Sequence, residues 1–115
     1  LPFLKNKIAS SSMTVPIPDG STVDLTIDIT KETTIEEINN LLENYSENDL
    51  KNIIGITYDP IVSSDVVRST FSGLIDGLAT MGINNKKIKL IIWFDNGWGY
   101  AARIIDTIKR LGQEL

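Results

Sequence analysis

The stretch from Lys86 to Leu111 constrains the fold more than any other part of this 115-residue chain. Its first half, Ile88 to Phe94, is almost continuously apolar, which is typical of a strand covered on both faces. The triplet Asp95-Asn96-Gly97 then predicts a tight turn, because Asp and Asn side chains close turns and glycine accepts unusual backbone angles. Apolar residues with helical spacing follow, and they predict an amphipathic helix: Ala101, Ile104, Ile105, Ile108 and Leu111.

The end of this predicted helix contains residues that are typical of a helix C-terminus. Lys109 and Arg110 suit the negative end of a helix, and Gly112 is predicted to stop it. A polar turn between a buried strand and a helix is a common place for a ligand. From these properties alone, an ordinary connection is the alternative interpretation.

Thr22 to Ile29 alternates between apolar and polar residues, which predicts a half-buried strand with an antiparallel neighbour. Asp24 and Asp28 fall on its polar face. They could be read as paired carboxylates or a metal site, but a solvated strand face explains them as well, and we predict no metal site.

A helix is predicted to begin near Thr33. Thr33 with Glu36, or Thr34 with Glu37, fits a capping box. One apolar stripe follows at helical spacing: Ile35, Ile38, Leu41, Leu42 and Tyr45. A second apolar run, beginning at Leu50, comes after it.

Three shorter segments complete the prediction. Met13 to Val15 is expected to form a short strand, Leu74 to Ile83 a longer one, and Asn84 to Lys86 the turn before the apolar strand. Without a steady alternation of strands and helices, the order indicates an α+β fold: a mixed, largely antiparallel sheet with helices on one face, ending in strand–turn–helix. The length suits a single domain over residues 1–115.

Composition excludes several function classes. The chain has no Cys and no His, so a thiolate, a disulfide and a Ser-His or Cys-His nucleophile cannot come from these residues. Ser63 and Ser64 beside Asp65 therefore fit a structural hydrogen-bonding role.

The net charge of −4 lacks the excess of positive charge that is typical of proteins that bind nucleic acid or an acidic membrane. No apolar run approaches the roughly 18 residues of a membrane span. Because the sequence begins with Leu1 instead of Met, we expect a piece of a longer protein.

The segment from Trp93 to Tyr100 resembles the signature WYDNEWGYS near the C-terminus of phosphorylating glyceraldehyde-3-phosphate dehydrogenases. Five other blocks match the family in order, so the resemblance covers nearly the whole chain. They are Leu1-Pro2-x-Leu4-Lys5, Val15-Pro16-x-Pro18, Val23-Asp24-Leu25-Thr26, Leu50-Lys51-x-Ile53-Ile54-Gly55 and Val62-Ser63-Ser64-Asp65.

The resemblance implies roles for individual residues. Asn96 matches the asparagine that holds the nicotinamide carboxamide of NAD, and Tyr100 matches a tyrosine beside that pocket; the alternative is that Asn96 builds the turn and Tyr100 packs. Thr14 stands where the family usually has an arginine that contacts phosphate, and one hydroxyl cannot replace a guanidinium there. Gly97 replaces the usual glutamate, while Arg103 is kept.

The resemblance also implies what lies elsewhere in the family: the Rossmann half, the nucleophilic cysteine and the base histidine. The chain is therefore expected to be a C-terminal part of a cytoplasmic, glycolytic, NAD-dependent dehydrogenase. It would be inactive alone, with no catalytic residue of its own, and would form a homo-oligomer. A non-catalytic binding or assembly module on the same scaffold is the alternative, because the helical stripe Ala101 to Leu111 would then lack its usual cover.

Overall fold

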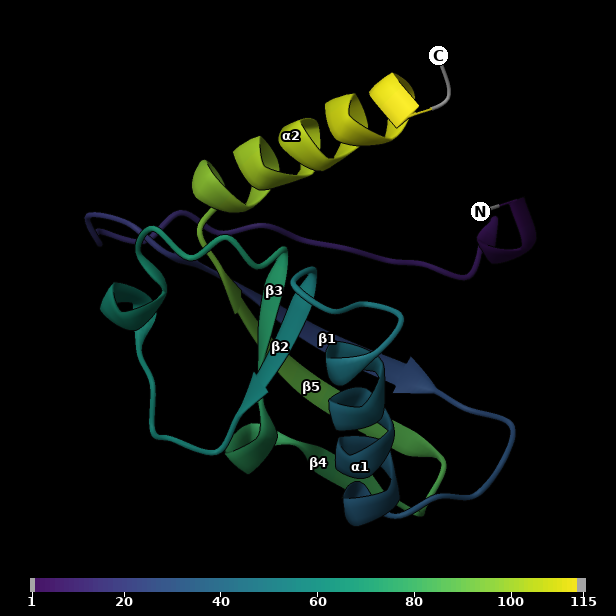
Figure 1. Ribbon diagram of the computed structural model, residues 1–115. Coiled ribbons are helices and arrows are strands. Elements are labelled where there is room, and N and C mark those ends of the chain that lie inside the picture. Colours follow the sequence, from purple (N-terminus) through teal and green to yellow (C-terminus); the bar gives the residue numbers. More distant parts are fainter. Residues whose placement is uncertain (1, 114–115) are drawn as a thin grey trace.

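The central strand of the structure is β5 (Lys87–Phe94), which lies inside a five-stranded mixed sheet. β1 (Ser21–Asp28) pairs with it antiparallel on one side, and β3 (Gly73–Asp76) and β4 (Met81–Ile83) pair antiparallel on the other. β2 (Ile54–Thr57) runs parallel to β3 and ends the sheet. This computed structural model confirms the predicted α+β class and the closing strand–turn–helix (Figure 1).

The structure describes residues 2–113, so Leu1, with which the first family block begins, lies outside the described residues. A 3₁₀ turn, η1 (Pro2–Leu4), is followed by an extended, exposed segment up to β1. The predicted strand Met13 to Val15 is wrong: among the described residues, no strand pairs with it. Propensity alone does not make a strand, because its backbone groups need a neighbouring strand to bond.

The helix α1 (Ile35–Glu47) begins with the second of the two predicted capping boxes. The Glu37 N–H donates to Thr34 Oγ1 at 3.1 Å, and the Thr34 N–H donates to Glu37 Oε2 at 2.9 Å. These bonds satisfy two N–H groups that the first turn of a helix leaves free. The backbone N–H of Thr34, and then the Thr33 hydroxyl, hold the pKa of Glu37 below its ordinary value.

α1 packs against the sheet through a face centred on Asn39, the one buried residue of the helix. The Asn39 side chain donates through Nδ2 to the Gly77 carbonyl oxygen at 3.0 Å. The predicted apolar stripe is only partly covered, since Ile38 and Leu42 are half-buried but Leu41 and Tyr45 are exposed. The apolar periodicity therefore predicted the helix correctly, but it predicted the buried face of that helix only approximately.

The register of β1 against β5 places three apolar pairs on the face of the sheet that α1 covers. Their members are Val23 with Ile92, Leu25 with Leu90, and Ile27 with Ile88. Ile88 and Leu90 form part of the core, but Val23 is 41% exposed and Leu25 36% exposed. The alternation predicted for β1 is therefore confirmed, whereas its burial is not, because α1 does not reach the outer strand.

The predicted strand Leu74 to Ile83 is wrong as a single strand. It divides into β3 and β4, separated by the 3₁₀ turn η3 (Gly77–Ala79). Asp76 starts that turn, since its Oδ1 accepts from the N–H groups of Leu78 at 3.1 Å and Ala79 at 3.0 Å. A short aspartate side chain here offers the backbone an alternative to the sheet ladder.

The turn before β5 is confirmed. Asn84 and Asn85 have φ angles of +55° and +54°, in the left-handed region that asparagine tolerates better than most residues. Two such residues in a row suit the tight turn between the antiparallel strands β4 and β5.

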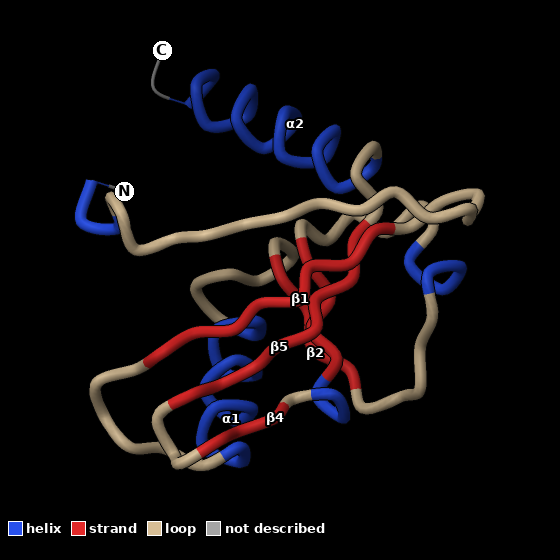
Figure 2. Tube along the Cα trace, turned by 180° about the vertical axis from the view of Figure 1, so that it is seen from behind, coloured by secondary structure: helices blue, strands red, loops and turns tan. Residues whose placement is uncertain are grey.

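The helix α2 (Trp98–Gln113) extends away from the sheet beyond the ends of the strands (Figures 1 and 2). The predicted stop at Gly112 is wrong, because the helix continues through it. A glycine stops a helix by adopting a positive φ, and Gly112 does not have one. Among residues 2–113, no helix has the length and apolarity needed to cross a membrane.

Candidate functional site

The turn between β5 and α2 is built by Asp95, whose side chain is only 3% exposed. Its Oδ1 accepts from the N–H groups of Gly97 and Trp98, both at 2.8 Å. Its Oδ2 accepts from the N–H of Arg68, also at 2.8 Å. The backbone N–H of Trp98, followed by those of Arg68 and Gly97, holds the pKa of Asp95 below its ordinary value. The carboxylate therefore fixes both the turn and the loop that faces it.

The first turns of α2 are held against the segment before β3. Gly99 is buried, and a Cβ at this position would lie 2.6 Å from the Phe71 carbonyl oxygen. Only a glycine permits this close approach of helix and backbone. The site is thus built on an element whose start cannot shift freely.

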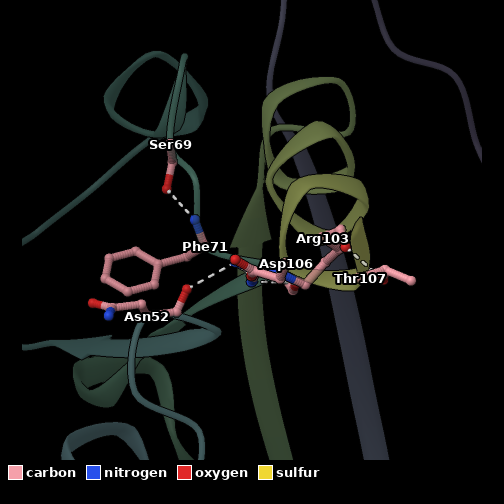
Figure 3. A network of polar contacts seen from close by, with 7 residues as sticks. Asn52, Ser69, Phe71, Arg103, Asp106 and Thr107 are labelled. Atoms are coloured by element: carbon pink, nitrogen blue, oxygen red, sulfur yellow. Dashed lines mark hydrogen bonds and ion pairs between the residues drawn. The ribbon is translucent and has the colours of Figure 1, made fainter. Parts of the chain in front are cut away.

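Arg103 ties the same end of α2 to two other segments (Figure 3). Its Nη1 donates to Ser72 Oγ and its Nη2 donates to the Asn52 carbonyl oxygen, both at 3.1 Å. Nε and Nη2 also lie 3.0 Å and 2.8 Å from Asp106 Oδ2, one turn further along the helix. The planar guanidinium can serve all three partners at once.

An open pocket of about 310 Å³ lies where these elements meet. It brings together the two residues proposed for the cofactor, Asn96 and Tyr100, both of which are exposed. Its lining consists of Ser72, Phe94, Asp95, Asn96, Gly99, Tyr100 and Arg103.

The Asn96 amide has no hydrogen-bond partner among the described residues, because Asp95 makes the bonds that close the turn. An unpaired carboxamide offers one acceptor and two donor hydrogens to a ligand. The site therefore presents a free amide on a rigid turn, next to an exposed aromatic ring.

Thr14, the third predicted site residue, does not line this pocket. It lies in the exposed, extended segment before β1. The structure therefore brings together two of the three predicted residues.

The turn-closing role predicted for the Asp95 side chain is confirmed, since its Oδ1 accepts from Gly97 and Trp98. The bond from Arg68 to Asp95 and the contacts of Arg103 are not predicted by the sequence. The partners of Arg103 lie 31 and 51 residues earlier in the chain, and no local pattern reveals them.

A second, larger hollow of about 600 Å³ lies beside the end of α1. It is lined by residues between Ser46 and Ile56 together with Phe71. In the part of the chain that the structure describes, no cluster of three or more His, Cys, Asp or Glu could hold a metal ion.

Residues 1–96 match the family model for the C-terminal domain of glyceraldehyde 3-phosphate dehydrogenase. A glyceraldehyde-3-phosphate dehydrogenase of Borreliella burgdorferi is 47% identical over 113 residues, which are 96% of this chain and 34% of that protein. A glyceraldehyde-3-phosphate dehydrogenase 2 of Bacillus subtilis is 34% identical over all 115 residues, again 34% of its length. The Geobacillus stearothermophilus enzyme is 43% identical over 106 residues, which are 92% of this chain and 32% of that enzyme. The chain thus spans about a third of the length of these curated relatives.

Proposed function

This chain belongs to the glyceraldehyde-3-phosphate dehydrogenase family, through the C-terminal domain, and we propose that it supplies one wall of a nicotinamide pocket. The parent protein would be an NAD-dependent dehydrogenase of glycolysis in the cytoplasm, acting as a homo-oligomer. The remaining walls would come from a Rossmann half that these 115 residues do not include.

The unpaired amide of Asn96 is the observation that carries this proposal. A carboxamide can pair with the carboxamide of nicotinamide through one donated and one accepted hydrogen bond. Asp95 holds the turn through bonds of 2.8 Å, so Asn96 would meet its ligand from a preorganised backbone. Bound NAD would supply the hydride acceptor, and Asn96 would fix which face of its ring meets the substrate.

Tyr100 would act beside Asn96. It follows one turn later on α2 and lines the same pocket with an exposed ring. An aromatic ring can cover a flat, apolar ligand surface while its hydroxyl stays in water. We therefore assign Tyr100 a packing role against the cofactor.

We propose no activity for the chain by itself. The family's reaction uses a cysteine thiolate and a histidine base, and this sequence contains neither residue type. Thr14 would not restore the phosphate contact of the family's arginine, because a hydroxyl lacks the charged fork of donors. The purified chain should therefore show no turnover, and measurable NADH formation by it would refute this assignment.

A chimera tests the cofactor role. The matching third of the Borreliella burgdorferi relative is replaced by this chain, and NADH formation is followed by absorbance. Replacing Asn96 by Ala should raise KM for NAD about 10- to 100-fold, as expected for one or two lost hydrogen bonds. Asn40→Ala, on the exposed side of α1, is the matched control.

The same chimera tests the phosphate contact. Thr14→Arg should raise kcat/KM for the phosphorylated substrate and leave KM for NAD unchanged. An Asn96→Ala chimera with an unaltered KM for NAD would overturn the cofactor role, whatever the effect of Thr14→Arg.

The exposed stripe on α2 favours a second candidate, a non-catalytic binding or assembly module. Its four large apolar side chains are each 45–63% exposed: Ile104, Ile105, Ile108 and Leu111. Contiguous apolar surface of this kind is typical of an interaction site. Light scattering separates the two candidates in part, because a strictly monomeric chain would count against a module that assembles through this stripe.

A further inference from the structure

The turn between β5 and α2 also contains a pair of residues that can react with each other. Of the nine asparagines in this chain, Asn96 alone is followed by glycine. Asparagine is a thermolabile residue, because the next backbone nitrogen can attack its side-chain carbonyl carbon. Gly97 favours that attack, since a residue without a Cβ leaves its nitrogen open to approach and gives the backbone wide conformational freedom.

We propose that Asn96 and Gly97 form a modification site, at which the Asn96 amide is converted to a carboxylate through a succinimide, and that Asp95 restrains this conversion in the folded chain. The conversion needs only two adjacent residues and a water molecule. It therefore does not depend on which other segments surround the turn, or on any cofactor role of Asn96.

The conversion proceeds in two balanced steps. The Gly97 nitrogen bonds to Asn96 Cγ while the bond between Cγ and Nδ2 breaks, and Nδ2 leaves as ammonia with the proton that the Gly97 nitrogen gives up. Water then adds to one of the two carbonyl carbons of the succinimide ring. Opening on one side gives aspartate, and opening on the other gives isoaspartate, in which the main chain runs through the side-chain carbon. No oxidant or reductant takes part.

The Asp95 carboxylate restrains the attacking nitrogen. The Gly97 N–H donates to Asp95 Oδ1 at 2.8 Å. A hydrogen bond to a carboxylate is charge-assisted, so it opposes both the loss of that proton and the movement of the nitrogen toward Asn96. The Arg68 N–H holds the same carboxylate from its other oxygen, also at 2.8 Å. The Gly97 nitrogen is therefore released for attack when the turn opens.

The first turn of α2 adds a second restraint. The Gly99 N–H donates to the Asp95 carbonyl oxygen at 3.1 Å. The Ala101 N–H donates to the Gly97 carbonyl oxygen at 3.0 Å. These bonds span Asn96 and Gly97 and limit rotation about their backbone bonds. Ring closure requires the attacking nitrogen and the carbonyl carbon to be close and aligned, and opening of the turn permits that alignment.

The two products have different effects on the turn. Aspartate at position 96 keeps the main chain and adds a negative charge at a helix N-terminus, where a negative charge is favourable. Isoaspartate lengthens the main chain by a carbon atom, so the N–H groups of Gly97 and Trp98 can no longer meet Asp95 as they do now. Both products are carboxylates, which accept hydrogen bonds but donate none, so under the proposed function either one would weaken the pairing with nicotinamide.

Peptide masses follow the conversion directly. It raises the mass by about 1 Da, and the tryptic peptide 90–103 contains Asn96 as its single asparagine. Peptide 32–51 holds four asparagines, none of them before glycine, and is the internal control. The folded chain is incubated near neutral pH beside the same chain in guanidinium chloride. Peptide 90–103 should gain mass ahead of the control, and about 10- to 100-fold faster in guanidinium chloride, where the bonds to the carboxylate are lost.

Two substitutions separate the reaction from its restraint. Gly97→Ala should preserve the turn, because a Cβ there would lie 3.4 Å from Asp95 Oδ1, at ordinary contact. Its methyl group hinders the attack and should slow the mass gain about 10-fold, with and without guanidinium chloride. Asp95→Ser keeps a residue that caps helices but replaces the carboxylate by a hydroxyl. It should speed the mass gain about 10-fold in the folded chain and leave it unchanged in guanidinium chloride.

A denatured wild-type chain in which peptide 90–103 gains mass no faster than peptide 32–51 would overturn the modification site. Equal rates for the wild type and Asp95→Ser, with both shown to be folded by circular dichroism, would overturn the restraint by Asp95. The masses are measured without NAD. They therefore do not bear on KM for NAD in the chimera, and the two proposals can fail separately.

Discussion

The two helices of this chain carry similar apolar stripes but have very different surroundings. α1 starts at a capping box and packs on the sheet, with Asn39 bonded to the Gly77 carbonyl oxygen. α2 is held near its start by Asp95, Gly99 and Arg103. Beyond Arg103, its large apolar side chains are 45–63% exposed.

This difference shows that an amphipathic sequence identifies the face that a helix would bury, but not whether the fold covers that face. A helix in water gains most of its stability from burying its apolar face, and α2 lacks that contribution beyond its first turns. We therefore expect the start of α2 to depend strongly on a few contacts. Substitutions along the two helices test this difference.

The largest effect is expected from Asp95→Ala. Three backbone N–H groups would lose their acceptor, and the turn that carries Asn96 would lose its closure. Thermal unfolding followed by circular dichroism should show a lower Tm than any other variant proposed here, with loss of helical signal from α2. A Tm within the range of surface substitutions would show that α2 is held by something else.

The same carboxylate predicts a pH dependence. Since the pKa of Asp95 is lowered from its ordinary value of 3.8, its contribution is complete above that value and is lost as the pH falls through the folded-state pKa. Unfolding measured from neutral to strongly acidic pH should show that loss. In Asp95→Asn the acid-induced loss should shrink, and the part that remains should come from Glu37, whose pKa is also lowered.

Gly99→Ala is expected to have the next largest effect. The added methyl group would meet the Phe71 carbonyl oxygen at 2.6 Å, so the helix must shift, at about 2 to 3 kcal/mol of unfolding free energy. Gly112→Ala in the same helix is the control, because nothing lies within 4 Å of a Cβ there. It should stabilise by up to about 1 kcal/mol through helix propensity. Equal effects of the two substitutions would contradict the close contact.

Asn39→Ala tests the attachment of α1. It removes the donor to the Gly77 carbonyl oxygen and leaves that acceptor unsatisfied, which should destabilise by about 1 to 2 kcal/mol in urea unfolding. The neighbouring Asn40 is exposed, so Asn40→Ala should stay within about 0.5 kcal/mol. A destabilisation by Asn40→Ala equal to that of Asn39→Ala would assign the effect to helix propensity, not to the bond.

Much of the fold could be predicted from local pattern. The Thr34–Glu37 cap, the alternation of β1, the turn at Asn84 and Asn85, and the strand–turn–helix around Asp95 each depend on a few adjacent residues. The family was predicted from the same kind of block, and the match over residues 1–96 confirms it.

The failures share a physical cause, which is that their outcome depends on distant residues. Met13 to Val15 lacks a neighbouring strand among the described residues, and β3 ends where Asp76 bonds the next turn. The burial of Asn39 depends on Gly77, 38 residues away. At the site, Asn96 and Tyr100 were predicted from the family motif, whereas Arg103 needs partners that only the folded chain brings near.

The smallest effect is expected on the exposed stripe of α2. A matching substitution to alanine on α1 provides the comparison. Ile108→Ala on α2 should change the unfolding free energy by no more than about 0.5 kcal/mol, because its side chain is already 63% exposed. Leu42→Ala on α1 removes a half-buried side chain and should destabilise by about 1 kcal/mol or more. Should Ile108→Ala match Leu42→Ala in urea unfolding, α2 must be covered in solution. Repeating the measurement across protein concentrations would then identify the cover, since a second copy makes the effect concentration-dependent and a contact within one chain does not.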